Sequence, residues 1–428
     1  MKNGRRCNIG GNFFAKKLPP GLPLSRDLMR ILVLNYEFPP VGGGGGRAAE
    51  DICRGLARMG HDVRVQTSLV RGLPRVESRD GYVIHRSWAM RRRADRCSVP
   101  EMFAYAVTNF LPSLRHAVTW KPDLIHVHFA VPSGAVGLIV SLLTGVPYVL
   151  STQLGDVPGG VPEQTDHLFN YLKPFTVPIW RRAAAVTVPA EHIRELAVQA
   201  YHVSVETVPN SVDPEQVRQS SGQAGHPRRL IFAGRFNPQK NLIFLLDLLK
   251  RIADLDWRMD MLGDGPMMNE VRTAITRLGL NGKVTLRGWV TPEEVENLMA
   301  ESDVLVLPSL SEGMPVVGLR ALAAGLAIAG SAIGGITDLV QDGVNGVLFP
   351  SDDLNAAEKA LREMLSSDDL LASMKRAGRS AAERFDLDQV AQTYERIFVD
   401  VLTRETGGRP GRRQGNSEVA PRSDTRGT

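Results

Sequence analysis

Short apolar runs alternate with stretches long enough for amphipathic helices in both halves of the sequence, and this alternation limits the possible folds more than any other feature. Buried parallel strands read as nearly continuous apolar runs, and the crossover between two of them is usually a helix. Such runs lie at residues 31–34, 63–67, 124–127, 148–151, 185–188 and 207–209, and again at 230–233, 258–262, 283–287, 304–307, 327–329 and 346–349. The pattern predicts an α/β chain with two doubly wound parallel-sheet domains.

A polar segment separates the two halves. After Asn210-Ser211-Val212-Asp213, residues 216–229 are rich in Gln, Ser, Gly and Pro, which is typical of a linker. We expect a disordered or non-native extension at 1–28, with translation starting at Met29. A first domain is expected at 29–213, a linker at 214–228 and a second domain at 229–385. A helix at 386–403 should pack back on the first domain, and a disordered tail should follow at 404–428.

Bulk properties exclude several classes of protein. No apolar stretch reaches the roughly 20 residues of a spanning helix, and the first residues lack the apolar core of a secretory signal. Three cysteines without a Cys-x-x-Cys spacing indicate neither a disulfide framework nor a thiolate metal cluster, so we expect a cytoplasmic protein. A net charge of +5 would suit an anionic substrate, an anionic lipid surface or nucleic acid, and charge alone does not choose among them.

Five consecutive glycines, Gly42 to Gly46, follow the first expected strand and precede a helical pattern at 47–60. Glycines let the backbone approach a ligand and aim helix N-terminal amides at an anion, although a flexible turn explains them equally well. The spacing Gly43-x-Gly45-x-x-Ala48 also matches a dinucleotide fingerprint. That interpretation needs an acidic residue at the end of the next strand, and residues 63–68 end without one, which disfavours NAD.

The strongest local signal lies between residues 307 and 325. An apolar strand runs into Ser309-Leu310-Ser311-Glu312-Gly313-Met314-Pro315, and the helical pattern that follows ends at Gly325. Proline suits the first turn of a helix and glycine its C-terminal cap. We therefore expect the backbone amides around Gly313 and Met314 to face the carboxyl edge of the sheet, where ligands bind in such folds.

Six motifs in one order make the chain similar to the retaining glycosyltransferases of the GT-B fold, in the large family numbered four. They are the glycine-rich loop, Asp123-Leu124-Ile125-His126-Val127-His128, Pro209-Asn210-Ser211-Val212-Asp213, Gly234-Arg235-Phe236-Asn237-Pro238-Gln239-Lys240, Gly263-Asp264-Gly265-Pro266 and Ser311-Glu312-Gly313. The resemblance runs from Met29 to about Leu402. It implies two Rossmann-like domains that face a central cleft, and transfer of a sugar from a nucleoside-diphosphate sugar with retention at the anomeric carbon. A GT-B phosphorylase or epimerase stays open as an alternative.

The resemblance also implies roles for single residues. Negative charge builds on the β-phosphate as the nucleoside diphosphate departs, and fixed cations stabilise it. Arg235 and Lys240 match the pair that holds the diphosphate, so neither a metal nor a cofactor is required. Glu312 matches the carboxylate that contacts the donor sugar, and His128 matches the histidine near the reacting carbon; these four form the expected catalytic set. The other expected donor-binding positions are Gly43, Gly44, Gly45, Gly263, Trp289, Val290, Gly313, Met314, Pro315 and Arg320.

Arg320 departs from the family pattern, which has a second glutamate at this position to hold the ribose hydroxyls. Arginine offers only donors where glutamate offers acceptors. We expect residue 320 to face the ligand edge, and three outcomes are open: Arg320 reaches nucleotide oxygens, it pairs with an internal acid, or normal donor use is lost. The last outcome would make the chain a catalytically silent nucleotide- or glycan-binding relative.

The histidines and the acceptor side complete the candidate site. We expect His126 and His128 to point to opposite faces of their strand, with His126 packed or hydrogen-bonded inside. A zinc site would need a third ligand, which the sequence does not convincingly supply. Where relatives often carry His-Gly, this chain has Leu154-Gly155, so Gly155 and Asp156 are the acceptor-side candidates.

Basic residues at 86–96 and aromatic residues at 102–120 suggest contact with an anionic membrane at the inner face of the cell membrane, although a helix packed on its own domain explains them too. No recognition motif accompanies the arginines, so we expect no nucleic-acid partner. The expected partners are a nucleotide-sugar donor and a glycan, lipid-linked or small-molecule acceptor, as in polysaccharide or glycolipid synthesis.

Overall fold

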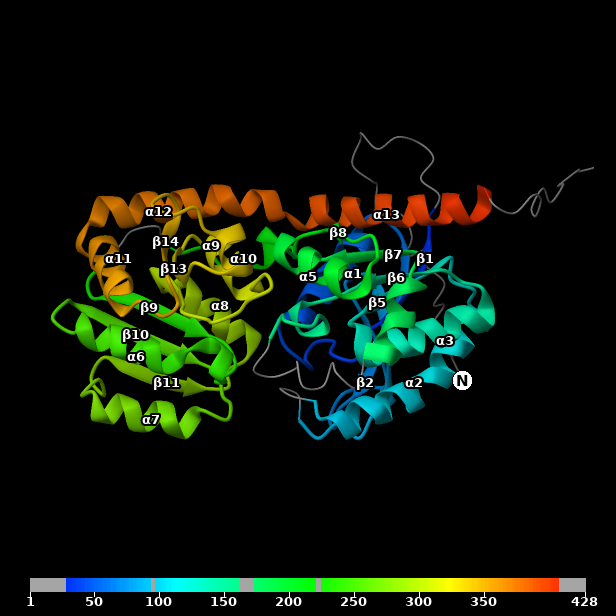
Figure 1. The fold of residues 1–428 in the computed structure, drawn as a ribbon, viewed down its shortest axis with the longest axis horizontal. Helices are drawn as coiled ribbons and strands as arrows, with labels where there is room; N and C mark the ends of the chain where they lie inside the picture. Colours follow the sequence, from blue (N-terminus) through cyan, green and yellow to red (C-terminus); the bar gives the residue numbers. More distant parts are fainter. Residues whose placement is uncertain (1–27, 94–96, 162–172, 221–224, 408–428) are drawn as a thin grey trace, which may run out of the picture.

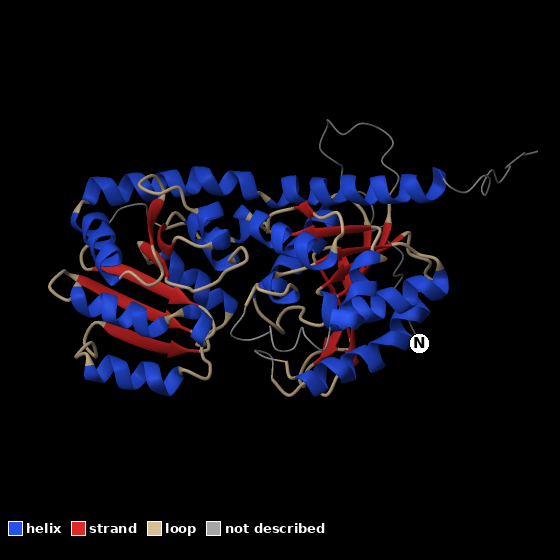
Figure 2. Ribbon diagram, viewed as in Figure 1, coloured by secondary structure: helices blue, strands red, loops and turns tan. Residues whose placement is uncertain are grey.

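The computed structural model describes residues 28–93, 97–161, 173–220 and 225–407 of the 428-residue chain. Two lobes lie side by side, each built on its own sheet, and one helical segment runs along both of them (Figures 1 and 2). Within the described residues, no helix combines the length and the apolar character needed to cross a bilayer.

The sheet of the first lobe has the strand order β3-β4-β2-β1-β5-β6-β7-β8, and every neighbouring pair is parallel except β3 with β4. Its strands are β1 (Arg30–Leu34), β2 (Asp62–Leu69), β3 (Val76–Arg79), β4 (Tyr82–Trp88), β5 (Leu124–His128), β6 (Tyr148–Ser151), β7 (Ala185–Val188) and β8 (Glu206–Thr207). Its helices include α1 (Gly44–Arg58), α2 (Val99–Thr119), α3 (Ala135–Thr144) and α5 (Glu191–Tyr201).

The sheet of the second lobe is parallel throughout, in the order β11-β10-β9-β12-β13-β14. Its strands are β9 (Arg228–Ala233), β10 (Trp257–Leu262), β11 (Val284–Gly288), β12 (Val304–Leu307), β13 (Ala327–Ser331) and β14 (Gly346–Phe349). Its helices are α6 (Leu242–Arg251), α7 (Met268–Arg277), α8 (Pro292–Ala300), α9 (Val316–Ala324), α10 (Gly334–Leu339), α11 (Leu354–Ser366) and α12 (Asp368–Ala382). The expected fold of two doubly wound parallel-sheet domains is confirmed.

The last helix, α13 (Leu387–Gly407), returns to the first lobe and lies along α1 (Figure 1). Its apolar face, which includes Val390, Tyr394 and Phe398, joins the core around β1 and β2. The helices cross so closely that a Cβ on Gly55 would lie 2.6 Å from that of Ala391. The helix continues to Gly407, so the prediction of a disordered tail from residue 404 was wrong for residues 404–407. Residues 408–428 lie outside the described part.

The hairpin of β3 and β4 was not expected from the sequence. The strand β4 carries His85, Arg86 and Trp88 among its apolar residues, which obscures the strand pattern. Nor do the described residues of the basic segment, 86–93, form one basic surface, and residues 94–96 lie outside the described part. Arg86 and Arg91 are buried, and Arg86 pairs with Glu77 at 2.7 Å, whereas the neighbouring arginines 92 and 93 are exposed.

Candidate active site between the two lobes

The loop after β9 places Arg235 and Lys240 at the carboxyl edge of the second sheet. Gly263, which follows β10, has a φ of +135°, and a Cβ there would lie 1.9 Å from the carbonyl oxygen of Gly234. Only glycine fits both the backbone conformation and the close approach. The two loops are thereby held together, with Arg235 exposed and Lys240 partly buried.

Glu312 is fixed between the loop after β9 and the loop after β12. Lys240 Nζ donates a hydrogen bond to Glu312 Oε1, and the Ser309 hydroxyl donates to the same oxygen at 2.7 Å. The side-chain amide of Gln239 donates to the carbonyl of Ser311 at 2.8 Å, which ties the loops a second time. The structure thus brings together Lys240 and Glu312, two of the four residues in the expected catalytic set.

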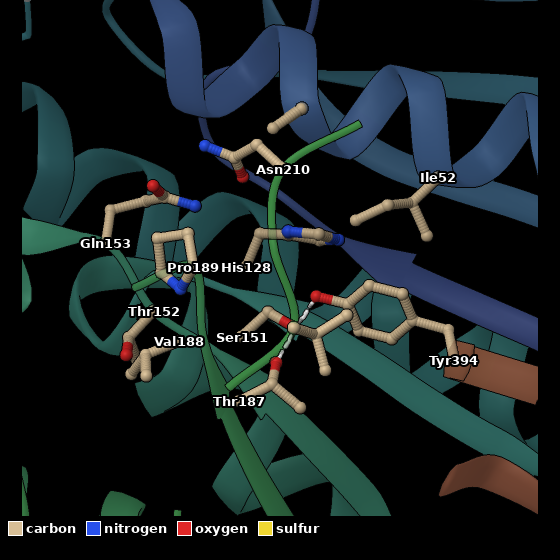
Figure 3. Close-up of a pocket in the computed structure, with 12 residues that line it drawn as sticks. Ile52, His128, Ser151, Thr152, Gln153, Thr187, Val188, Pro189, Asn210 and Tyr394 are labelled. Carbon is tan, nitrogen blue, oxygen red and sulfur yellow. Dashed lines mark hydrogen bonds between the residues drawn. The ribbon is translucent and has the colours of Figure 1, made fainter. Parts of the chain in front are cut away.

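A small pocket at the carboxyl ends of β5, β6 and β7 contains His128 (Figure 3). The ring lies near Asn210 and Ser151, with Tyr394 of α13 across the pocket. Burial lowers the pKa of His128 to about 3, so the imidazole is neutral at physiological pH. Within the described residues, His128 Nε2 and Thr152 Oγ1 are buried without a hydrogen-bond partner. Both residues line the pocket, so these two atoms are available to a ligand or to a water molecule.

His126 and His128 do not point to opposite faces of β5, as we had expected. Their ring centroids are 4.2 Å apart, because residues two positions apart along a strand share one face. His126 is fully buried, and its Nε2 lies 2.7 Å from the Ser151 hydroxyl, so its expected packed and hydrogen-bonded role is confirmed.

The two lobes meet at the loop that carries Glu312. The side-chain amide of Asn210, which lines the His128 pocket, donates to the carbonyl of Met314 at 2.9 Å. A Cβ on Gly313 would lie within 3.4 Å of atoms from Ile193 and Leu154 in the first lobe. The structure therefore places the loop with Gly313 and Met314 against the first lobe, near the His128 pocket. Arg235 and Lys240 do not line that pocket.

The glycine-rich segment is partly helical, although we had expected a loop up to residue 46. Gly43 is the N-cap of α1, and Gly44 and Gly45 belong to its first turn. A Cβ on Gly46 would lie 2.0 Å from the carbonyl oxygen of Glu37, which explains why position 46 requires glycine. Gly44 faces Val316 at the start of α9, so this N-terminus lies at the boundary between the lobes.

The remaining expected donor residues surround the same edge. Trp289 and Val290 directly follow β11, and the Trp289 side chain is 56% exposed. Pro315 is the N-cap residue of α9, and Gly325 ends that helix in the left-handed conformation. Among the described residues, no group of three or more His, Cys, Asp or Glu side chains could hold a metal ion.

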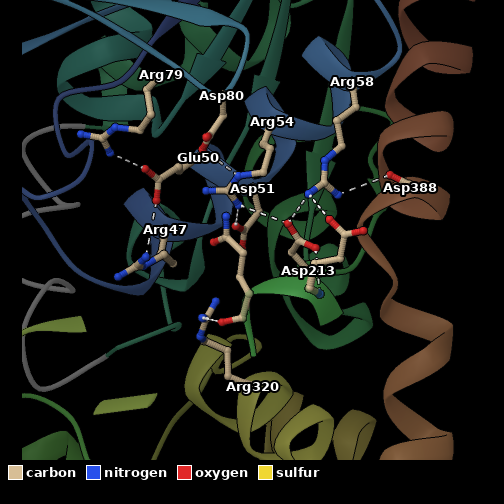
Figure 4. A network of polar contacts seen from close by, with 12 residues as sticks. Arg47, Glu50, Asp51, Arg54, Arg58, Arg79, Asp80, Asp213, Arg320 and Asp388 are labelled. Carbon is tan, nitrogen blue, oxygen red and sulfur yellow. Dashed lines mark hydrogen bonds and ion pairs between the residues drawn. The ribbon is translucent and has the colours of Figure 1, made fainter. Parts of the chain in front are cut away.

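Arg320 of α9 lies next to the network of charged side chains around α1 (Figure 4). Its Nε donates to Glu296 Oε1 at 2.5 Å, and its Nη2 donates to the carbonyl of Gln216 at 3.3 Å. Of the three outcomes that the sequence left open, pairing with an internal acid is the one observed. The side chain is 8% exposed, so its position also differs from the expected contact with the open ligand edge.

Both lobes of the chain match models of glycosyltransferase families. The model of the family "Glycosyl transferases group 1" matches residues 213–381, and that of the "Glycosyl transferase 4-like domain" matches residues 43–211. The chain belongs to the group 1 glycosyltransferases of the GT-B fold. This glycosyltransferase is 24% identical over 383 residues to the N-acetyl-alpha-D-glucosaminyl L-malate synthase of Bacillus anthracis, covering 87% of this chain and 97% of that relative.

Other comparisons of the glycosyltransferase agree on its fold. The UDP-Gal:alpha-D-GlcNAc-diphosphoundecaprenol alpha-1,3-galactosyltransferase of Escherichia coli is 26% identical over 300 residues, covering 66% of this chain and 76% of that enzyme. The structure of sucrose-phosphate synthase from Thermosynechococcus elongatus matches with a TM-score of 0.76 at 19% identity, over 88% of this chain and 100% of that one. The Anabaena protein HepE in complex with UDP and glucose matches with a TM-score of 0.69 at 18% identity, over 87% and 100% of the two chains.

Of the two residues that we expected on the acceptor side, Gly155 is exposed, whereas Asp156 is buried. The Asp156 carboxylate accepts the backbone N–H of Ala130 at 2.8 Å and that of Gln153 at 2.9 Å. It therefore holds the loops after β5 and β6 together, and these loops flank His128. Asp156 is a positioning residue in this structure, and its expected contact with the acceptor stays a prediction.

We expect Asp156→Asn to change how stability depends on pH. Burial raises the pKa of Asp156 to about 7, opposed by its backbone hydrogen bonds. A raised pKa means that this carboxyl stabilises the fold fully below about pH 4 and loses that contribution as the pH rises through about 7. Asparagine does not ionise, so the stability advantage of the native chain over the variant should shrink between pH 5 and pH 8. Urea unfolding at both pH values measures this, and a constant difference would contradict it.

Proposed function

We propose that this glycosyltransferase moves a sugar from a nucleoside-diphosphate sugar to a glycan, lipid-linked or small-molecule acceptor, with retention at the anomeric carbon. The observation that carries the proposal is the cation and carboxylate pair of Lys240 and Glu312, in a loop that contacts the first lobe beside His128. The proposed nucleotide-sugar donor is also supported by relatives whose names include UDP-Gal or a complex with UDP-glucose.

In the proposed reaction, the bond between the anomeric carbon and the diphosphate oxygen breaks, and the bond to the acceptor oxygen forms on the same face of the sugar. Arg235 and Lys240 stabilise the charge that develops on the leaving diphosphate. A diphosphate oxygen takes the proton of the acceptor hydroxyl, so no enzyme nucleophile is needed. The neutral ring of His128 offers its unpartnered Nε2 to the donor sugar, and Glu312 orients the sugar hydroxyls.

A thermal-shift screen of nucleoside-diphosphate sugars, followed by a transfer or hydrolysis assay, tests this proposal. We expect at least one nucleotide sugar to raise the melting temperature and to be turned over. Glu312→Gln should lower kcat/KM about tenfold or more, because the amide replaces a charged acceptor, which corresponds to a loss of about 1.4 kcal/mol. NMR of the product should show retained anomeric configuration.

The results also separate the alternatives. An inverted product would overturn the retaining mechanism. Binding without turnover of any donor would favour the catalytically silent relative, for which Arg320 paired with Glu296 is the structural argument.

A further inference from the structure

A stripe of apolar side chains on α2 faces solvent. Val99, Phe103, Val107 and Leu111 follow one another at intervals of four residues, so they lie on one side of the helix. Their exposed fractions are 64%, 71%, 57% and 67%. The opposite side of α2 carries the buried Tyr105 and packs on the core. The helix is therefore apolar on both its inner and its outer side.

The stripe continues onto neighbouring elements. The helix α3, which contacts α2, exposes Ile139, Leu142 and Leu143, and both helices lie at the outer side of the first lobe (Figure 1). Trp88 is 60% exposed, and its carbonyl accepts a hydrogen bond from Thr108 of α2, so it adjoins the stripe. We define the docking face as Trp88, Met90, Val99, Phe103, Val107, Leu111, Val118, Ile139, Leu142 and Leu143. More than half of the exposed large hydrophobic residues in the described part of the chain belong to it.

Charges near the docking face are mainly positive. Arg92, Arg93, Arg115 and Lys121 are exposed, from the segment before α2 to the turn after it. The acidic residues between positions 97 and 150 are Glu101 and Asp123, and both are engaged: Glu101 accepts the N–H of Ser98 at 2.7 Å, and Asp123 accepts that of Arg30 at 2.8 Å. An apolar stripe with arginine and lysine beside it suits the boundary between acyl chains and anionic headgroups.

We propose that the docking face binds the surface of an anionic lipid bilayer. Phe103, Leu111 and Leu143 enter the headgroup region, and Trp88 lies at its polar boundary. The flanking cations Arg92, Arg115 and Lys121 contact lipid phosphates. A large exposed apolar surface indicates that the docking face has a binding partner. The positive charge beside it favours anionic lipid over a second copy of the chain, because the cations of the two copies would repel each other.

The helix that carries the docking face packs with its inner side toward the candidate active site. The inner side of α2 places Tyr105 against Tyr36, with ring centroids 6.2 Å apart, and Tyr36 packs on Phe129 at 5.0 Å, directly after His128. Arg93 lies 3.9 Å from Asp264 of the second lobe. A lipid-linked acceptor in the same bilayer would therefore reach the site from this side, an extension that rests on the proposed function.

Vesicle flotation of the full chain tests the proposal. We expect the chain to float with vesicles of phosphatidylcholine and phosphatidylglycerol, to bind pure phosphatidylcholine at least about tenfold more weakly, and to dissociate as salt rises. Phe103→Glu with Leu111→Glu should lower binding about tenfold or more, because two charged groups replace apolar contacts. Arg115→Glu with Lys121→Glu should lower it without changing the apolar stripe.

The matched control is Val399→Glu, which places a charge at an apolar position of α13 that is 48% exposed on another face, and it should float like the native chain. Circular dichroism checks that every variant is folded. Turnover of the donor, assayed without vesicles, should be the same in every variant and in the native chain. Failure of docking can therefore be told apart from failure of the transferase proposal. Absence of flotation, equal binding to neutral vesicles, or a dimer that Phe103→Glu with Leu111→Glu dissociates would each overturn the proposal.

Discussion

Lys240→Gln should lower kcat/KM about 100-fold while the protein stays folded. Lys240 carries a positive charge in the loop after β9, directly beside Glu312. Preorganised donors aimed at developing negative charge are typically worth 10²- to 10³-fold in rate, about 2.7 to 4 kcal/mol. Glutamine keeps a donor for Glu312 but loses the charge that faces the departing diphosphate, so the loss should fall on the chemical step.

Steady-state kinetics with the nucleotide sugar found by the screen measures this effect. The matched control is Lys250→Gln, an exposed lysine of α6, which should retain native kinetics. Unfolding midpoints of both variants separate loss of catalysis from loss of structure. A Lys240→Gln enzyme with kcat/KM within threefold of the native value would remove Lys240 from the reaction.

Arg54→Ala should destabilise the chain by about 3–5 kcal/mol, the usual effect of removing one partner from a buried ion pair. Arg54 is 4% exposed and pairs with Asp51 at 2.8 Å, with Asp80 at 3.0 Å and with Asp213 at 3.8 Å (Figure 4). Asp51 and Asp213 have 0% exposure. Alanine would leave both carboxylates buried without this cation, at the junction of α1 and the interlobe segment.

The deficit of Arg54→Ala should also grow with pH. Burial raises the pKa of Asp51 to about 6, and Arg54 opposes that shift. The protonated carboxyl favours the folded state, so its contribution is present below about pH 4 and is lost as the pH rises through about 6. Without Arg54 the pKa rises further, and urea unfolding should show a larger deficit at pH 8 than at pH 5.

A matched control for Arg54→Ala is Arg194→Ala, which removes an arginine from the exposed pair with Glu191 on α5. It should unfold at the same urea concentration as the native chain. If Arg54→Ala behaves like this control, the buried network does not stabilise the fold.

Apolar strands made the fold predictable, and loop motifs identified Lys240 and Glu312 as candidates for one site, although the ion pair between them was not predicted. Parallel strands place their carboxyl ends on one edge, so the loops after β9 and β12 had to meet. The pairing of Arg320 was not predictable, because its partner Glu296 lies on another helix, α8. How α8 and α9 pack against each other cannot be inferred from the local sequence. The strand β4 was missed because arginine and histidine interrupt its apolar pattern, and in the structure Arg86 is buried beside Glu77.

The position of α13 has a consequence for biosynthesis. Tyr394 and Phe398 complete the core of the first lobe, and Tyr394 lies 3.4 Å from Ser151 in the His128 pocket. During translation, residues 30 to 208 are synthesised and leave the ribosome well before Tyr394 and Phe398 are added to the chain. The first lobe therefore cannot complete its core until the second lobe and α13 have been synthesised. Until then, part of its hydrophobic surface stays exposed.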